Sequence, residues 1–199
     1  MSTESSSPKR RYEKRARAAH EQATRTRIVE AAIALHGTVG PARTTVSAIA
    51  ENAGVRRATV YHHFPDERAL MLGCSGTWAE RNPPPDPATW MELDDPSERL
   101  EAALRALYRW YEAVEPMLSA VLRDIEAMPI IAEIQERRLA YLSQVEEGLA
   151  AGWEPADARL RATIGLALDF FAWRTLSERG LGRDDTVAVM ASAVRAAVT

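Results

Sequence analysis

Apolar residues recur at helical spacing in two neighbouring stretches of the chain, residues 45–53 and 55–64. This spacing places the apolar side chains of each stretch on one face of an α-helix. Gly54 separates the stretches and can adopt the positive φ that a tight turn between crossing helices requires. Pro65 ends the second helix, because proline disfavours helical geometry in the residue before it. We therefore expect a helix-turn-helix whose inward faces consist of Val46, Ile49, Ala50 and Ala53, then Val55, Val60 and Phe64.

The outward face of the second helix is rich in hydrogen-bond donors that can reach phosphates or base edges. Two arginines stand at the start of this helix, where a guanidinium group can bind a phosphate or a guanine edge bidentately. The alternative is a helical hairpin with a solvated basic face. The spacing favours DNA binding, and the outward residues are Arg56, Arg57, Thr59, Tyr61, His62 and His63.

Residues 24–70 resemble the DNA-binding domain of the TetR family of bacterial transcriptional regulators. The resemblance rests on an opening helix TRTRIVEAAIALHGTVG, on the pattern T-x-x-x-I-A-x-x-A-G-V from Thr45 to Val55, on the following T-V-Y-H-H-F, and on Leu70. It implies a motif at residues 45–64 in which Thr45 caps a helix and touches phosphate. It also implies base contacts from Arg56, Arg57 and Thr59, and contacts to the DNA backbone from Tyr61 and His62.

The chain departs from the family pattern at two positions. Arg56 replaces the serine that usually precedes the recognition helix, and Glu67 replaces a lysine that often contacts phosphate. Arg68 follows and is the candidate replacement for that phosphate contact. The candidate DNA-binding residues are Thr45, Arg56, Arg57, Thr59, Tyr61, His62 and His63.

Charge is distributed unevenly along the chain. Residues 1–70 hold 12 Lys and Arg against 7 Asp and Glu, a difference of +5, whereas residues 71–199 hold 13 against 21, a difference of −8. Together these give the net charge of −3. The basic front half is attracted to a duplex and the acidic back half is repelled from it, which favours one orientation on DNA.

The first 23 residues run from a Ser-rich start into KRRYEKRARAAH and lack the apolar core of a secretory signal. We interpret residues 1–23 as a basic flexible arm that lies in a minor groove or along phosphates; the alternative is a solvated tail.

A single cysteine, Cys74, allows no intrachain disulfide, and no stretch has the length of a membrane span. We therefore expect a cytoplasmic protein.

Helical spacing of apolar residues continues after Leu70, without the alternation of a strand. The sequence predicts an all-α protein with an N-terminal three-helix DNA-binding domain at residues 24–70. Residues 71–199 are expected to form a helical bundle for ligand binding and dimerisation, similar to the regulatory domain of the same family.

The segment at residues 155–177 is apolar on two faces when it is treated as one helix. One face suits the core of the subunit, and the second suits another surface. In the resembled family the last two helices pair with those of a second copy, and a helix-turn-helix that reads palindromic DNA needs such a dimer. The alternative is burial within the same subunit. The predicted interface residues are Phe170, Trp173, Val187, Met190, Ala191 and Val194.

Aromatic and methionine residues of the back domain are candidates for an effector pocket, although the same residues can pack a core. Little unpaired charge lies in the apolar stripes, so we expect a small, largely apolar effector. The candidate pocket residues are Trp78, Trp90, Tyr108, Tyr111, Met117, Met128 and Phe171.

Enzymatic chemistry is disfavoured, because the sequence contains no Gly-rich phosphate loop, metal-spaced Cys/His cluster or nucleophile elbow. No cofactor or metal is expected. The sequence predicts a transcriptional regulator, acting as a repressor that a small effector releases from a palindromic operator. The alternative is a DNA-binding or architectural dimer that ignores small molecules.

Overall fold

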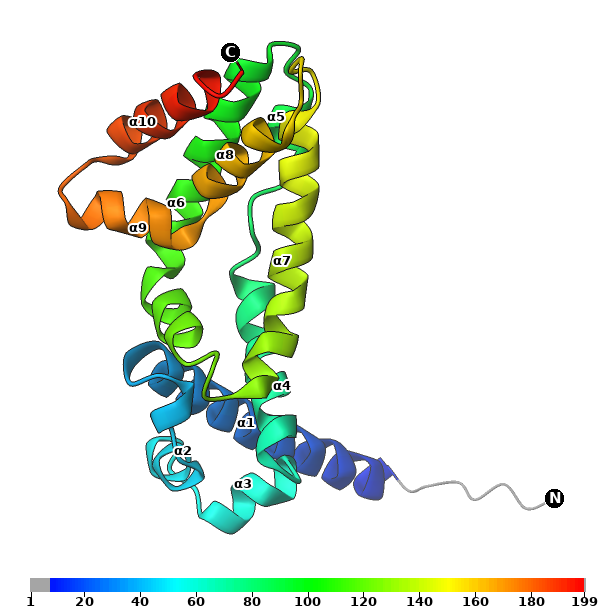
Figure 1. Ribbon diagram of the computed structural model, residues 1–199. Helices are drawn as coiled ribbons and strands as arrows, with labels where there is room; N and C mark the ends of the chain where they lie inside the picture. The colour runs from blue at the N-terminus through cyan, green and yellow to red at the C-terminus, as the bar shows by residue number, and fades with distance from the viewer. Residues whose placement is uncertain (1–7, 199) are drawn as a thin grey trace. The chain divides into compact units, whose positions relative to one another are not determined.

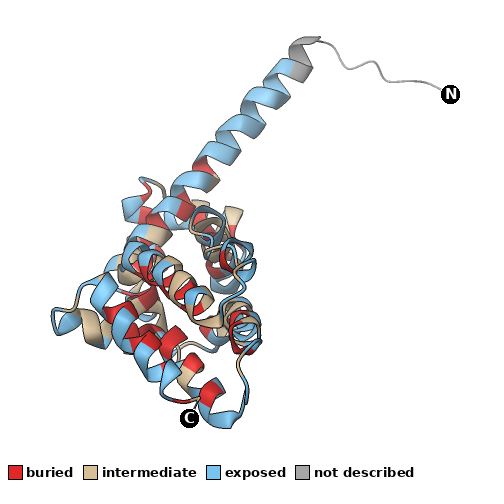
Figure 2. Cartoon of the chain, turned by 90° about the horizontal axis from the view of Figure 1, so that it is seen from above, coloured by how far each residue is buried: buried red, intermediate tan, exposed pale blue. Residues whose placement is uncertain are grey.

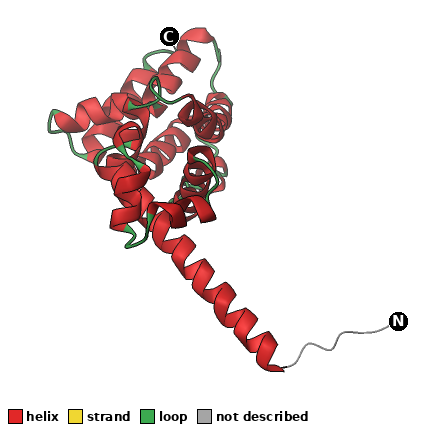
Figure 3. Cartoon of the chain, turned by 90° about the horizontal axis from the view of Figure 1, so that it is seen from below, coloured by secondary structure: helices red, strands yellow, loops and turns green. Residues whose placement is uncertain are grey.

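The computed structural model describes residues 8–198, with side chains from residue 12 onward. This part of the chain contains helices and connecting loops and no strand (Figure 3). The chain divides into two compact units. The first holds the chain up to Arg81 together with Pro116–Ile134, and the second holds Asn82–Glu115 and the residues from Gln135 onward. The predicted all-α fold with an N-terminal helix-turn-helix is confirmed.

The first unit is built on a long helix, α1 (Pro8–Thr38), followed by a single 3-10 turn, η1 (Pro41–Arg43) (Figure 1). Two short helices, α2 (Val46–Asn52) and α3 (Arg57–His63), pack with it, and α4 (Glu67–Arg81) completes the set. Their buried core contains Ile28 and Ala32 of α1, Ile49 of α2, Val60 of α3 and Cys74 of α4.

Helix α1 begins earlier than the sequence pattern predicts. Residues 8–23, interpreted as part of a flexible arm, are helical in the structure. The basic, polar composition of this segment favours an arm, but a run of Lys, Arg, Glu and Ala also has good intrinsic helix propensity. Residues 1–7 of the predicted arm lie outside the described residues. The compact first unit also ends at Arg81 rather than at Leu70 and includes Pro116–Ile134.

Helices α5 (Ala88–Met91), α6 (Pro96–Arg123) and α7 (Pro129–Ala150) follow. The last two supply residues to both units, and the division within α6 falls at Pro116. Proline has no backbone N–H, so the helix lacks one intrahelical hydrogen bond at this position. Asp95 caps α6 by accepting hydrogen bonds of 2.8 Å from the backbone N–H groups of Ser97 and Glu98.

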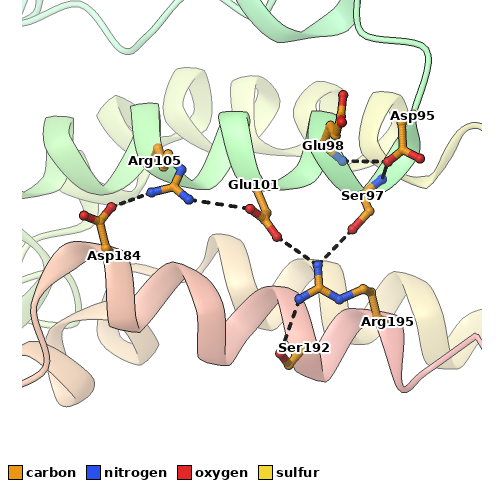
Figure 4. A network of polar contacts seen from close by, with 8 residues as sticks. All are labelled: Asp95, Ser97, Glu98, Glu101, Arg105, Asp184, Ser192 and Arg195. Atoms are coloured by element: carbon orange, nitrogen blue, oxygen red, sulfur yellow. Dashed lines mark hydrogen bonds and ion pairs between the residues drawn. The ribbon is translucent and has the colours of Figure 1, made fainter.

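Helices α8 (Ala158–Leu168), α9 (Phe170–Glu178) and α10 (Arg183–Arg195) complete the second unit. Polar side chains join α10 to α6, as Figure 4 shows. Arg195 donates to Ser97 and Glu101 at 2.8 and 2.9 Å, and Arg105 pairs with Asp184. These pairs are exposed, so they contribute little to stability and chiefly fix the register of the two helices.

Asp169 breaks the segment that the apolar pattern predicts as a single helix. Its backbone is extended, with φ −73° and ψ 132°, and its side chain caps α9 by accepting a 2.8 Å hydrogen bond from the N–H of Ala172. The break changes the helical phase, so that Phe170 and Trp173 are buried while Phe171 is exposed.

No helix in the described part of the chain has the length and apolar content needed to cross a membrane.

Candidate nucleic-acid interface

The helix-turn-helix has the local geometry that its sequence predicts. Thr45 caps α2, since its hydroxyl oxygen accepts a 3.1 Å hydrogen bond from the N–H of Ala48. Gly54 has a φ of 64°, in the left-handed region that glycine adopts without steric cost. The N–H of Val55 then bonds to the carbonyl of Ala50 at 2.9 Å, which closes the turn into α3.

Packing at its C-terminal end holds α3 in position. Phe64 is almost fully buried, and the guanidinium of Arg25 lies 4.6 Å from the centroid of its ring. A Cβ added to Gly73 of α4 would lie 2.9 Å from the same ring, too close for an ordinary contact. Glycine at this position therefore lets α4 approach the end of α3 closely.

The outward residues of α3 are accessible to different degrees. Arg56, Arg57 and His62 are exposed, whereas Thr59, Tyr61 and His63 are half-buried. Arg57 donates a 3.3 Å hydrogen bond to the hydroxyl of Tyr61, and this bond raises the pKa of the arginine. The guanidinium thus lies along the exposed side of the helix, 5.5 Å from the centroid of the tyrosine ring. The structure therefore places the six predicted residues on one short helix and its cap.

His63 differs from its neighbour His62 in its surroundings. Burial, followed by the nearby charge of His62, lowers the pKa of His63. The carboxylate of Glu21 opposes this shift and the guanidinium of Arg25 adds to it. A lowered pKa keeps the imidazole neutral at pH 7, where it can donate one hydrogen bond and accept another.

Arg68, the candidate phosphate contact, has a partner within its own unit. Its guanidinium lies 2.7 Å from a carboxylate oxygen of Glu133 in α7, and this pair raises the pKa of the arginine. Both side chains are about half exposed. The sequence alone did not reveal this pair, because the two residues are far apart in the chain.

Asp124 is a buried residue that the sequence pattern does not assign to this domain. Its carboxylate accepts hydrogen bonds from the N–H of Ala42 at 3.0 Å and from Nε of Arg123 at 2.9 Å. Arg123 also donates to the carbonyl of Val39 at 3.1 Å. The hydrogen bond from Arg123 lowers the pKa of Asp124, so the carboxylate stays charged. These contacts hold the connection between α1 and α2, directly before the helix-turn-helix.

The candidate pocket residues are divided between the two units. Trp78, Met117 and Met128 belong to the first unit, and Trp90, Tyr108, Tyr111 and Phe171 belong to the second. The hydroxyls of Tyr108 and Tyr111 donate to the carbonyls of Ala167 and Leu168 at 2.8 and 2.7 Å. These carbonyls close α8 and have no intrahelical donor, so both tyrosines support the end of that helix.

The predicted dimer-interface residues face the interior of their own subunit. All six side chains are buried in the single chain, which disfavours a contact with a second copy at these positions. The phase change at Asp169 accounts for the burial of the first two, and the other four form the buried side of α10. The residues concerned are Phe170, Trp173, Val187, Met190, Ala191 and Val194. The outward apolar side chains of α8, α9 and α10 are instead Leu166, Phe171 and Val189, which are 55%, 49% and 47% exposed.

Comparison with known proteins identifies the first unit. Residues 28–74 match the family model described as bacterial regulatory proteins, tetR family. The fold is similar to that of a TetR family transcription regulator from Marinobacter aquaeolei, with a TM-score of 0.61 and 19% identity over 90% of this chain and 97% of that chain. A TetR-like transcriptional regulator from a Rhodococcus species gives 0.60 and 14% over 86% and 93%.

A third similar structure contains a ligand. The transcriptional regulator FadR from Bacillus subtilis, in complex with stearoyl-CoA, gives a TM-score of 0.52 and 21% identity over 87% of this chain and 97% of that chain. No curated protein matches the sequence. The structural similarities show the fold, and the family match lies within the first unit, over α1 to α4.

Proposed function

We propose, from the premise that this chain is a TetR family transcriptional regulator, that it represses transcription by binding an inverted repeat in DNA through α3. The observation that carries the proposal is the surface of that helix. Arg56, Arg57 and His62 are exposed there, and the half-buried Thr59, Tyr61 and His63 add further hydrogen-bonding groups. A helix of this kind fits the major groove, where base edges present a distinct pattern of donors and acceptors.

Reading an inverted repeat requires two copies related by a twofold axis. We assign the contact between them to the outward side chains of α8, α9 and α10. Leu166, Phe171 and Val189 support this assignment, because they are large apolar residues left exposed in the single chain. Burying them against a second copy removes apolar surface from water, at roughly 25 cal/mol for each Å².

We further propose that a small, largely apolar ligand binds the second unit and weakens DNA binding. The similar regulator FadR, in complex with stearoyl-CoA, supports a ligand with a long apolar chain, although the CoA group of that ligand is large, polar and anionic. Only a modest coupling is needed, since 1 to 3 kcal/mol changes the affinity for DNA roughly 5- to 150-fold.

The alternative is a dimer that binds DNA without responding to small molecules. It is favoured by Tyr108 and Tyr111, whose hydroxyls bond to the end of α8 and whose side chains are completely buried. Linkage separates the two proposals. A ligand found by thermal-shift screening should bind less tightly in the presence of saturating operator, and equal affinity with and without DNA supports the alternative.

Selection of duplexes from a random-sequence pool tests the central proposal. The full chain should enrich an inverted repeat whose half-site centres lie about one helical turn, or a multiple of it, apart. The double variant Arg56→Ala/Arg57→Ala should lose this enrichment, whereas Arg161→Ala, an exposed arginine of α8, should keep it. Absence of any enriched sequence with the unaltered protein would contradict the proposal.

A further inference from the structure

The N-terminal part of α1 is a helix without a packing partner in the described chain. Every residue from Tyr12 to Ala23 is exposed, and the first buried residue of the helix is Thr24. Figure 2 shows this part extending away from the neighbouring helices with exposed residues on all sides. A helix that is polar on every face gains no stability from a core, and short isolated helices are marginal in water. A binding partner outside the chain would supply the missing stabilisation.

The charge of this extension identifies the chemistry of that partner. Residues 8–17 contain six Lys and Arg and a single Glu. The side chain of Arg17 is 84% exposed and has an i to i+4 ion pair of 3.2 Å with Glu21. Such a pair contributes only a few tenths of a kcal/mol. Among the residues whose side chains are described, Lys14 and Arg15 are exposed and have no ion pair. The extension is therefore complementary to a polyanion.

Its cations are aligned with the recognition helix. Lys14, Arg17, Glu21 and Arg25 follow one another at spacings of three, four and four residues, which places them on a single face of α1. The C-terminal end of α3 lies at this same face. Arg25 stacks on the ring of Phe64, and both Glu21 and Arg25 act on His63. The basic face of the extension thus continues from the end of the helix that carries the candidate base contacts.

We propose that the helical extension of α1, residues 8–23, binds the phosphate backbone of DNA beside the half-site read by α3. This inference rests on the proposed function. At 1.5 Å per residue the extension is about 24 Å long, equivalent to about seven base pairs of flanking duplex. The contact is made by a rigid helix through its Lys14 and Arg17 face, so it adds affinity in both half-sites without reading bases.

The salt dependence of DNA binding tests the proposal with the full chain. Lys14→Gln/Arg17→Gln removes the two described cations of this face, and Arg15→Gln is the matched control on another side of the same exposed helix. On an operator with ten flanking base pairs at each end, the double variant should lower the slope of log K against log salt by about 0.9 for each phosphate that the protein no longer neutralises. The control should retain the slope of the unaltered protein.

Trimming the duplex provides the second measurement. Once the flanks are removed, the unaltered protein and the double variant should bind with the same slope, because the phosphates contacted by the extension are absent. If the double variant retains the slope of the unaltered protein on the long duplex, the Lys14 and Arg17 face of the extension does not contact DNA. If the unaltered protein binds neither duplex, it is the proposed function that fails.

Discussion

At the residue scale, Arg57 is the side chain expected to read a base. Replacing Arg57 by alanine should cost roughly 1 to 3 kcal/mol of binding to the selected operator and relax discrimination at one symmetric position. Tyr61→Phe should weaken binding to all sequences alike, because a contact to the DNA backbone carries no sequence information. Titrating operators with single base changes in each half-site separates the two effects. Unchanged discrimination by Arg57→Ala would remove its assignment as a base reader.

Arg68 should contribute little to DNA binding, since Glu133 already binds its guanidinium. We expect Arg68→Ala to leave the salt slope unchanged, whereas the loss of one fully neutralised phosphate would lower it by about 0.9. Folding should change little as well, because exposed ion pairs contribute about 0 to 1 kcal/mol. A decrease of about 0.9 in the slope would mean that Arg68 leaves Glu133 for a phosphate when DNA binds.

His36 makes the stability of the first unit depend on pH. Burial lowers the pKa of this histidine from 6.5 to about 4, and its Nδ1 lies 3.6 Å from the sulfur of Cys74. The unfolded chain takes up a proton near pH 6.5 while the folded chain does not, so stability is complete above pH 6.5 and falls towards pH 4. The decrease amounts to roughly 3 kcal/mol.

Urea denaturation between pH 4 and 7.5 measures this dependence. His36→Gln should remove the part of the pH dependence that comes from this histidine. The free energy of unfolding of the variant should then change less between pH 4 and 7.5, with only other groups contributing. His20→Gln, at an exposed position of α1, serves as the control and should preserve the original slope. Equal pH dependence in the two variants would show that His36 titrates normally in the folded protein.

At the scale of the element, the connection between α1 and α2 depends on residues from α6 and the turn after it. Asp124→Ala removes the acceptor of the 3.0 Å hydrogen bond from the N–H of Ala42, which should cost roughly 0.5 to 1.5 kcal/mol of stability. Gly40→Ala should also destabilise the unit, because Gly40 has a φ of 93° and an added Cβ would collide with Arg123 and Asp124. Hydrogen exchange of α2 amides, compared with those of α10, should reveal the destabilisation locally.

The residues at the ends of a helix decide whether its boundaries can be predicted from the sequence. The cap at Thr45 and the turn at Gly54 are encoded by adjacent residues, so the sequence was sufficient to predict both. The break at Asp169 was not, because its neighbours are apolar on both sides and the segment resembles one continuous helix. An aspartate three residues before Ala172 is a capping signal, but a mid-segment aspartate is also common on exposed helix faces. The break therefore sets which side chains of α9 are buried, and the apolar pattern alone does not show this.

Contacts between residues far apart in the chain are the second kind of feature that the sequence pattern does not predict. The pairs of Arg68 with Glu133 and of Asp124 with Ala42 join residues separated by 65 and 82 positions. Periodicity describes which face of a helix is apolar and does not specify which helices meet. The candidate DNA-binding face was predictable because one short helix and its cap carry nearly all of it.

At the scale of the whole molecule, two neighbouring residues of α10 should respond differently to the same substitution. Val189→Arg adds a charge to the proposed surface for a second copy, so it should dissociate the dimer and weaken DNA binding while the chain stays folded. Ala191→Arg forces a charge into a fully buried position and should instead unfold the second unit. Sedimentation velocity and thermal unfolding distinguish these outcomes. A stable dimer of the Val189 variant would place the interface elsewhere.

The first unit consists of two separate segments of the chain, and this restricts how chimeras of two such regulators can be built. Its compact body includes Pro116–Ile134 from the middle of the chain, and Asp124 within that segment bonds to the backbone shortly before the helix-turn-helix. A chimera joined after Arg81 would take α3 from one parent protein. The carboxylate of Asp124, which supports the connection before the helix-turn-helix, would come from the other parent. Exchange of operator preference between such proteins therefore requires transplanting two separate segments, with the helices α6 and α7 spliced near Pro116 and Ile134.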